Sequence, residues 1–307
     1  MQDGGPGRVF LQEGGRRKAA VVNQGAVNRK RCCMKIFTGK KKSILAMGVL
    51  GLSAALTGFD VSARSDIQSD QVVPLIIGGT EVPRGKYPFM ASLQDEGDHF
   101  CGGSLLDTRS ILTARHCVVD ITNDEAASHV SVTVGQTLLS DGIGSQRRGI
   151  SAVFVSTLEG SDLAVVVLDR AVTGIAPVAL PTPGSDALYR PGQMATVIGW
   201  GNTDSEGFPY HPDRLREVDV PILSMEECII AAPEFDFSPN FCGGVRGKGA
   251  CHGDSGGPVI RVIGGRVYQI GTVFGGIRCA GQGAPGVYAN LSDQRLWDSL
   301  IPIWVKF

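Results

Sequence analysis

Short apolar runs, rich in valine and isoleucine, recur along the last two thirds of the chain. Eight of them are residues 130–134, 150–155, 163–168, 195–198, 215–220, 258–263, 267–274 and 287–290. The chain contains 42 glycines and 16 prolines, many of them between these runs. Many short strands separated by turn residues predict an all-β sandwich or barrel. The pattern alone does not distinguish the two.

One segment near the end of the chain follows a helical rather than a strand pattern. Leu296, Trp297, Leu300 and Ile301 fall at the spacing of one helix face. The spacing predicts a helix from Asp293 to about Ile303, with a packing role.

The first 75 residues lack a core pattern and divide into three parts. Residues 1–33 are rich in glycine and arginine, and Met34 makes a more ordinary start. We therefore interpret residues 1–33 as a non-native or disordered basic extension. Residues 34–63 fit a signal peptide, since Lys40–Lys42 precede an uncharged stretch and small residues close it. Residues 64–75 would be an activation propeptide, followed by a domain over residues 76–307.

The signal peptide predicts export to an extracellular or periplasmic compartment, with only transient membrane contact. The alternative is an uncleaved membrane anchor, but the uncharged stretch of 17 residues is slightly short for one. Residues 76–307 contain 17 Lys or Arg against 25 Asp or Glu, a formal net charge of −8. This charge argues against a nucleic-acid partner, because phosphates would be repelled.

The cysteines indicate disulfides rather than a metal. Cys32 and Cys33 fall in the basic extension, which leaves six in the domain: Cys101, Cys117, Cys228, Cys242, Cys251 and Cys279. An even number in an exported chain implies disulfides, although six cysteines allow about 15 pairings. No Cys-x-x-Cys pair or His/Cys cluster has zinc-ligand spacing.

The segment Gly253–Pro258 reads Gly-Asp-Ser-Gly-Gly-Pro and places a serine among glycines. A hydroxyl is a weak nucleophile, so Ser255 requires a base and an orienting acid. The segment also fits the nucleophile elbow of α/β-hydrolases, whose histidine follows the serine. All five histidines of this chain precede Ser255, namely His99, His116, His129, His211 and His252. The α/β-hydrolase fold is therefore excluded.

His116, beside Cys117, is the best candidate base, and Asp162 is the best candidate acid. Asp162 opens an apolar run, which indicates a carboxylate at the mouth of a buried strand. Burial of a charge is costly unless it is hydrogen-bonded, and an imidazole N–H is a suitable donor.

The order His116, Asp162, Ser255 is that of chymotrypsin-like serine proteases, and the chain from Ile76 onward resembles the trypsin/chymotrypsin superfamily. Matching motifs are Ile-Ile-Gly-Gly at 76–79, Cys-Gly-Gly-Ser-Leu at 101–105, Gly-Trp-Gly at 199–201, Pro-Gly-Val-Tyr at 285–288 and the segments around the three residues above. The resemblance implies two six-stranded antiparallel β-barrels with a C-terminal helix and the triad between the barrels. It also implies the disulfides Cys101–Cys117, Cys228–Cys242 and Cys251–Cys279.

The same resemblance assigns roles to individual residues. Ser255 would attack, His116 would transfer the proton, and Asp162 would fix the histidine tautomer. The backbone N–H groups of Gly253 and Ser255 would form the oxyanion hole. Cleavage at Leu75-Ile76 would free the Ile76 amine to pair with Asp254. Leucine before that bond differs from the Arg or Lys of most trypsin-like zymogens, which indicates another activator or the enzyme itself.

The pocket for the side chain before the scissile bond would be lined by Gly249, Ala250, Gly276 and Gly286. Trypsin-like relatives have an aspartate at the position of Gly249. An open, uncharged pocket predicts a preference for Leu, Phe, Tyr or Met. Residues 136–145 match a calcium loop of relatives but contain only Asp141, so we expect no metal or cofactor.

Three positions depart from the family pattern. Arg115 replaces a small residue, and the cation would either disfavour the imidazolium of His116 or reach solvent. Phe274 and Gly275 replace a serine that supports the triad aspartate and a tryptophan that lines the substrate channel. These changes predict a less firmly held Asp162 and weaker substrate binding beyond the pocket.

The sequence thus predicts a secreted, monomeric serine endopeptidase that acts on proteins or peptides, with a proteinaceous inhibitor as a further partner. The alternative is a catalytically weak or inactive homologue that binds partners through the same fold. It depends on Arg115, Phe274 and Gly275. A third function, as an esterase or acyltransferase, has no residue in its favour.

Overall fold

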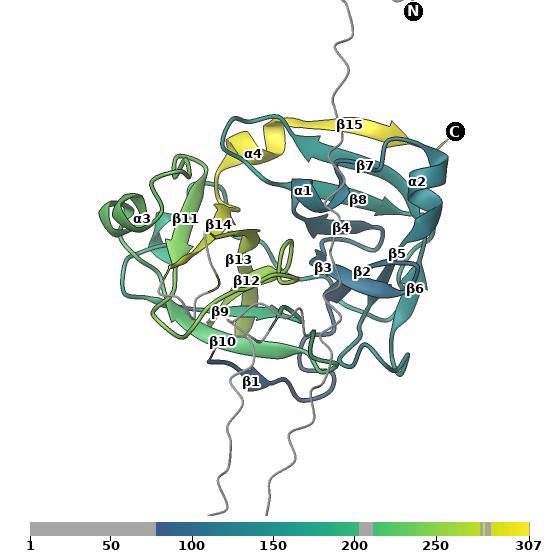
Figure 1. The fold of residues 1–307 in the computed structure, drawn as a ribbon, viewed down its shortest axis with the longest axis horizontal. Helices are drawn as coiled ribbons and strands as arrows, with labels where there is room; N and C mark the ends of the chain where they lie inside the picture. Colours follow the sequence, from purple (N-terminus) through teal and green to yellow (C-terminus); the bar gives the residue numbers. More distant parts are fainter. Residues whose placement is uncertain (1–77, 203–210, 277–278, 280–283, 307) are drawn as a thin grey trace, which may run out of the picture. The chain divides into compact units, whose positions relative to one another are not determined.

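The computed structural model describes residues 78–202, 211–276, 279 and 284–306, which belong to one compact unit spanning Gln68–Phe307. The predicted basic extension, signal peptide and propeptide lie outside the described residues, and so does Ile76. The described part is built mainly of antiparallel strands that form two curled sheets (Figure 1). The all-β prediction is confirmed.

The first sheet has eight strands in the order β15-β7-β8-β4-β3-β2-β5-β6. Their bounds are β2 (Met90–Asp95), β3 (Asp98–Leu105), β4 (Ser110–Thr113), β5 (Val130–Val134), β6 (Gln146–Arg148), β7 (Ile150–Ser156), β8 (Ala164–Leu168) and β15 (Leu300–Val305). Side chains such as Leu93, Leu105 and Ile111 are fully buried in its core.

The second sheet has seven strands in the order β1-β10-β9-β12-β13-β14-β11. Their bounds are β1 (Thr80–Glu81), β9 (Met194–Gly199), β10 (Arg216–Pro221), β11 (Asn240–Gly243), β12 (Pro258–Ile263), β13 (Arg266–Gly275) and β14 (Gly286–Asn290). Its core includes Val197, Val259 and Tyr288. Each sheet exceeds the expected six strands because edge strands are added: β1 here, β6 and β15 in the first sheet.

Helices are short: α1 (Arg115–Val118), α2 (Asp124–His129), α3 (Met225–Ala231), α4 (Gln294–Asp298) and the 3-10 helix η1 (Asp186–Leu188). Helix α4 begins where it was predicted, with the side chain of Asp293 accepting from the backbone of Arg295. The predicted extension to Ile303 is wrong, because residues 300–305 form β15 and pair with β7. Pro302 cannot sit inside a helix, and β-branched Ile301 and Ile303 favour a strand.

The two sheets meet at a close backbone contact that positions Ser255. The backbone N–H of Gly102 in β3 donates to the carbonyl of Ser255 at 2.8 Å. Thr113, at the end of β4, donates its hydroxyl to the carbonyl of Gly102 at 2.8 Å. Gly256 lies against both, at φ +78°, where a side chain has no room. The absence of a side chain at Gly256 therefore allows the two sheets to approach.

We predict that Gly256→Ala destabilises the domain well beyond the cost of its backbone angle. The new Cβ would lie 2.2 Å from Thr113 Oγ1 and 2.5 Å from the Gly102 carbonyl oxygen. Gly265→Ala is the matched control, because Gly265 has φ +79° and nothing within 4 Å of the added atom. Urea unfolding should give about 1 kcal/mol for the control and about 1–3 kcal/mol more for Gly256→Ala. Equal losses would show that the contact does not constrain position 256.

Candidate active site

His116 is positioned by the short helix α1, which follows directly from β4. A disulfide between Cys101 in β3 and Cys117 in α1 ties the helix to the first sheet. The implied pairs Cys228–Cys242 and Cys251–Cys279 are also present. The side chain of His116 is 47% exposed, so its ring is accessible while its backbone is fixed.

Asp162 lies just before β8 and is buried, with 4% of its surface exposed. Both of its carboxylate oxygens accept from His116: Oδ1 from the backbone N–H at 2.8 Å and Oδ2 from ring Nδ1 at 2.6 Å. The side-chain hydrogen bond raises the pKa of His116 above its ordinary value, against the opposing effect of burial. The contact holds the neutral ring as the Nδ1–H tautomer, which leaves Nε2 as the basic nitrogen.

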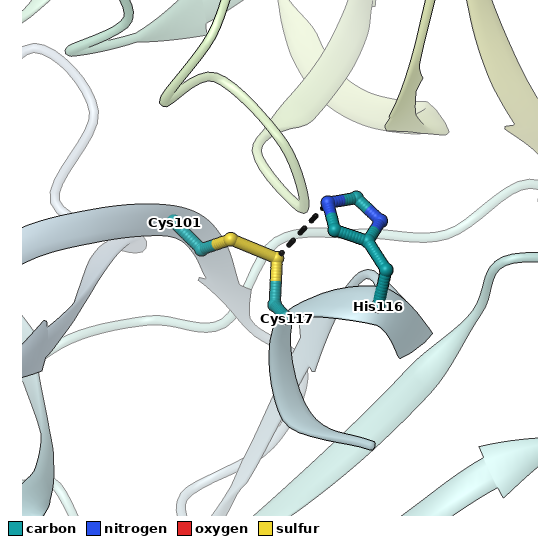
Figure 2. A group of neighbouring side chains, drawn as sticks. All are labelled: Cys101, His116 and Cys117. Carbon is teal, nitrogen blue, oxygen red and sulfur yellow. Dashed lines mark hydrogen bonds between the residues drawn. A yellow bond between two sulfur atoms is a disulfide. The ribbon is translucent and has the colours of Figure 1, made fainter. Parts of the chain in front are cut away.

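The cluster of Cys101, His116 and Cys117 is compact enough to suggest a metal site (Figure 2). The two sulfurs are joined in a disulfide, however, and a metal requires the thiolate form of cysteine. Figure 2 shows Nε2 of His116 turned toward Sγ of Cys117, at 3.7 Å. The cluster therefore packs the ring of His116 against a disulfide and offers no thiolate ligand.

Ser255 reaches this cluster from the second sheet. Its carbonyl oxygen lies 3.9 Å from Sγ of Cys117, the same sulfur that contacts His116. Among the described residues, no hydrogen bond joins Ser255 Oγ to His116 Nε2. Free enzymes often hold such catalytic bonds long or poorly aligned. The structure thus places the three predicted residues in one neighbourhood and shows the hydrogen bond of one pair.

The segment before Ser255 contains the predicted oxyanion-hole glycine and a buried acid. Gly253 has φ +93°, and a Cβ there would lie 2.6 Å from Cε1 of His211. The carboxylate of Asp254 is fully buried and accepts from the backbone N–H groups of Gly201 at 2.7 Å and Cys251 at 2.9 Å. Burial raises the pKa of Asp254 to about 7. The predicted partner, Ile76, is outside the described residues.

His99 is a residue of this site that the sequence did not reveal. Its Nε2 lies 3.1 Å from the carbonyl oxygen of Gly253, and its Nδ1 lies 2.8 Å from the hydroxyl of Ser92. Burial lowers its pKa to about 4, so the ring is neutral near pH 7. Neutral His99 can then donate from Nε2 to Gly253 and accept from Ser92. The contact spans 154 residues of sequence, and no local pattern marks it.

A cavity of about 50 Å³ adjoins Ser255. The described residues that line it include no carboxylate, lysine or arginine: Ala250, Cys251, His252, Ser255, Val273, Gly275, Gly276 and Cys279. Of the four predicted pocket residues, Ala250 and Gly276 line this space. Gly249 and Gly286 do not, and Gly286 packs against Tyr288. The volume holds one or two waters, so a large substrate side chain requires the walls to move apart.

Of the three positions that depart from the family pattern, Gly275 lines the cavity beside Ser255, and the side chains of the other two make the following contacts. Arg115 donates to the carbonyl of Ser156 at 3.4 Å. Phe274 packs edge-on against Phe235, with ring centroids 5.2 Å apart. Asp141, the carboxylate of the loop compared with a calcium site, forms an ion pair with Arg84 at 2.7 Å.

Comparison with known proteins agrees with the fold. The family model described as Trypsin matches residues 76–297. A trypsin of Saccharopolyspora erythraea is 34% identical over 224 residues, which cover 70% of this chain and 93% of the relative. Trypsin-1 of Astacus astacus is 34% identical over 239 residues, with 72% and 98% covered. Trypsin 5G1 of Aedes aegypti is 36% identical over 242 residues, with 72% and 83% covered.

Among the described residues, no helix is long and apolar enough to cross a membrane.

The family match spans most of the chain, and the relatives are covered over most of their own lengths. The chain therefore belongs to the trypsin family and is a serine endopeptidase.

Proposed function

We propose that this endopeptidase hydrolyses protein substrates through an acyl-enzyme on Ser255, with His116 as general base and Asp162 as its orienting acid. The observation that supports the assignment most strongly is the paired contact between Asp162 and His116. One carboxylate oxygen binds the imidazole at 2.6 Å and the other binds the backbone of the same residue. This arrangement fixes the ring and favours its protonated form during the reaction.

The reaction would proceed in two halves. Ser255 Oγ attacks the substrate carbonyl carbon as its proton passes to Nε2 of His116, and the imidazolium then protonates the leaving amine. A water, activated by the same ring, hydrolyses the ester and restores Ser255. The backbone N–H groups of Gly253 and Ser255 would stabilise the oxyanion in each half. His99 binds the carbonyl of Gly253 and so holds the Gly253–Asp254 peptide group, which lies between the peptide groups of the two proposed donors.

We predict that a fluorophosphonate probe labels Ser255 in the processed enzyme and fails to label Ser255→Ala.

Activity should rise with pH through the raised pKa of His116, since the base must be neutral to accept a proton. Asp162→Asn should lower kcat by about 10⁴, because the ring loses its correct tautomer. His129→Gln is the matched control, since within the described part of the chain the polar side-chain contact of His129 is with exposed Glu96, and its loss should leave kcat unchanged. If the fluorophosphonate probe does not label folded, processed protein, the result would favour the alternative of a non-catalytic binding homologue.

We further propose that the pocket beside Ser255 accepts large apolar side chains. The support is chemical: among the described residues no carboxylate lines the cavity, and Gly249 stands where trypsin-like enzymes have an aspartate. An arginine or lysine entering such a pocket would lose its hydration without a countercharge.

Cleavage of matched peptide amides tests this specificity. We expect kcat/KM on leucine or phenylalanine amides to exceed that on arginine amides by at least about tenfold, the effect of 1.4 kcal/mol. Gly249→Asp should shift the preference toward arginine, by supplying a countercharge once the walls move apart and the pocket reaches position 249. A wild-type enzyme that prefers arginine would refute the proposed pocket.

Activation, we propose, occurs by cleavage of Leu75-Ile76, after which the Ile76 ammonium pairs with Asp254. The support is the fully buried Asp254, which contacts backbone donors but no cation among the described residues. In the uncleaved chain its pKa of about 7 exceeds the ordinary value of 3.8. Between these values the folded state holds the proton more tightly than the unfolded state, so stability falls as pH rises.

We predict that an inactive precursor loses up to about 4 kcal/mol of stability from this group between pH 4 and pH 8. Asp254→Asn should remove that part of the slope, because an amide does not titrate. Cleavage at Leu75-Ile76 should also remove it, because the new ammonium favours ionised Asp254. Urea unfolding across this pH range, with mass spectrometry to confirm the state of the bond, measures both. Full activity from an intact precursor would contradict the activation proposal.

We also propose export through the signal peptide at residues 34–63, a monomeric state and binding of a proteinaceous inhibitor. They follow from the sequence and the family. N-terminal sequencing of the secreted protein tests the first, and it also shows whether a peptide from residues 1–33 exists.

A further inference from the structure

A groove of about 400 Å³ lies at the open seam of the first sheet. Strands β6 and β15 are the two edges of that sheet, and both contribute side chains to the groove. Helix α2, the starts of β5 and β7 and the residues just after β8 complete its walls. None of the residues proposed for catalysis, the oxyanion hole or the pocket lines it. Its volume falls within the range of ligand sites.

Four cations and two carboxylates line this groove: Arg147, Arg148, Arg170, Lys306, Asp124 and Asp169. Within the described residues, only Arg170 approaches a carboxylate, that of Asp169 at 3.6 Å. The groove therefore carries two net positive charges in a domain whose formal charge is −8. A concave surface with uncompensated charge concentrates counter-ions.

The guanidinium groups are held in place by neutral acceptors. Arg148 donates to the carbonyl of Ala171 from Nε at 3.1 Å and Nη2 at 2.9 Å. It also bonds the carbonyl of Arg147, at 2.9 Å, which receives a second bond from Arg170 at 3.2 Å. Arg147 itself uses Nε to reach the hydroxyl of Ser131 at 2.9 Å. These contacts fix the arginines without neutralising them, which lowers the entropy cost of binding an anion.

The rest of the lining favours a short acidic peptide over a long polyanion. Trp304 is mostly buried in the groove, with its indole N–H donating to Asp124 at 3.1 Å. Asp124, Asp169 and the acidic domain around the groove would repel a polyanion that extends beyond the groove more than a short acidic peptide that fits within it. A peptide can direct carboxylates to the arginines, an apolar side chain to Trp304 and backbone N–H groups to the two aspartates.

We propose that this groove binds a short acidic segment of a protein partner, at a site separate from the catalytic residues. Arginine forks match carboxylates in a bidentate geometry, which gives such a site specificity as well as attraction. A protein substrate or inhibitor that occupied both sites would bind more tightly than through either alone, because the second contact becomes intramolecular. The groove binds its segment whether or not Ser255 is catalytic.

Fluorescence anisotropy of a fluorescein-labelled hexaglutamate peptide tests the proposal directly. The protein is the full domain carrying Ser255→Ala, so that no cleavage interferes and the result does not depend on activity. Hexaglutamate should bind at low ionic strength, and salt should weaken the binding. The matching hexalysine peptide should not bind.

Replacing both Arg147→Gln and Arg170→Gln should weaken hexaglutamate binding by at least about tenfold, the scale of one lost charge-assisted hydrogen bond. The matched control, Arg190→Gln with Arg266→Gln, removes two exposed arginines outside the groove and should change affinity less than about twofold. Lys306→Gln alone provides a second groove variant should the double variant unfold. Both groove variants should keep full activity on a short amide substrate when Ser255 is present.

Three results would overturn the proposal. One is equal affinity of hexaglutamate for the groove variant and the control. Another is binding of a sulfated polysaccharide without binding of hexaglutamate, which would assign the groove to a different class of partner. The last is binding of inorganic phosphate alone, which would reduce the groove to a small-anion site.

Discussion

The hydrogen bond between His116 Nδ1 and the carboxylate of Asp162 is the contact on which the rest of the site depends. A carboxylate that is 4% exposed is costly to ionise unless donors surround it. Here both oxygens are satisfied by one residue, through its ring and its backbone. His116 thus donates the hydrogen bonds that make the burial of Asp162 tolerable, and Asp162 in turn orients the ring of His116. No serine hydroxyl is needed for this, although the family resemblance predicts a supporting serine at the position of Phe274.

The geometry of the proposed active site also depends on how closely the two sheets approach. His116 lies in helix α1 and Asp162 lies just before β8, both next to strands of the first sheet, whereas Ser255 lies just before β12 of the second sheet. The bond from Gly102 to Ser255 fixes their relative position, and Gly256 leaves the room for it. His99 adds a contact from the first sheet to Gly253, so the first sheet holds both the proposed base and the proposed oxyanion hole. Packing between the sheets therefore sets the geometry of the proposed site.

Local sequence signals predicted most strands of the fold. Features that depend on contacts between residues far apart in the sequence were missed. The eight predicted apolar runs match strands to within about one residue at each end, because β-branched residues and turns mark them locally. The helix was extended too far, since Leu300 and Ile301 fit both helical spacing and an edge strand. His99 was missed because its partner, Gly253, is distant in sequence. Side chains of the two edge strands, β6 and β15, both line the groove described above. These strands are far apart in the sequence, so no local pattern reveals the groove.

NMR titration of His116 tests the central claim most directly, because it observes the contact itself. The protein is the processed domain carrying Ser255→Ala, compared with the same protein carrying Asp162→Asn as well. The account predicts a pKa of His116 above 6.5 with Asp162 present, and a lower value once the carboxylate becomes an amide. The Nδ1 proton should exchange slowly only in the first protein. Identical titration curves in the two proteins would contradict the claim that Asp162 governs His116.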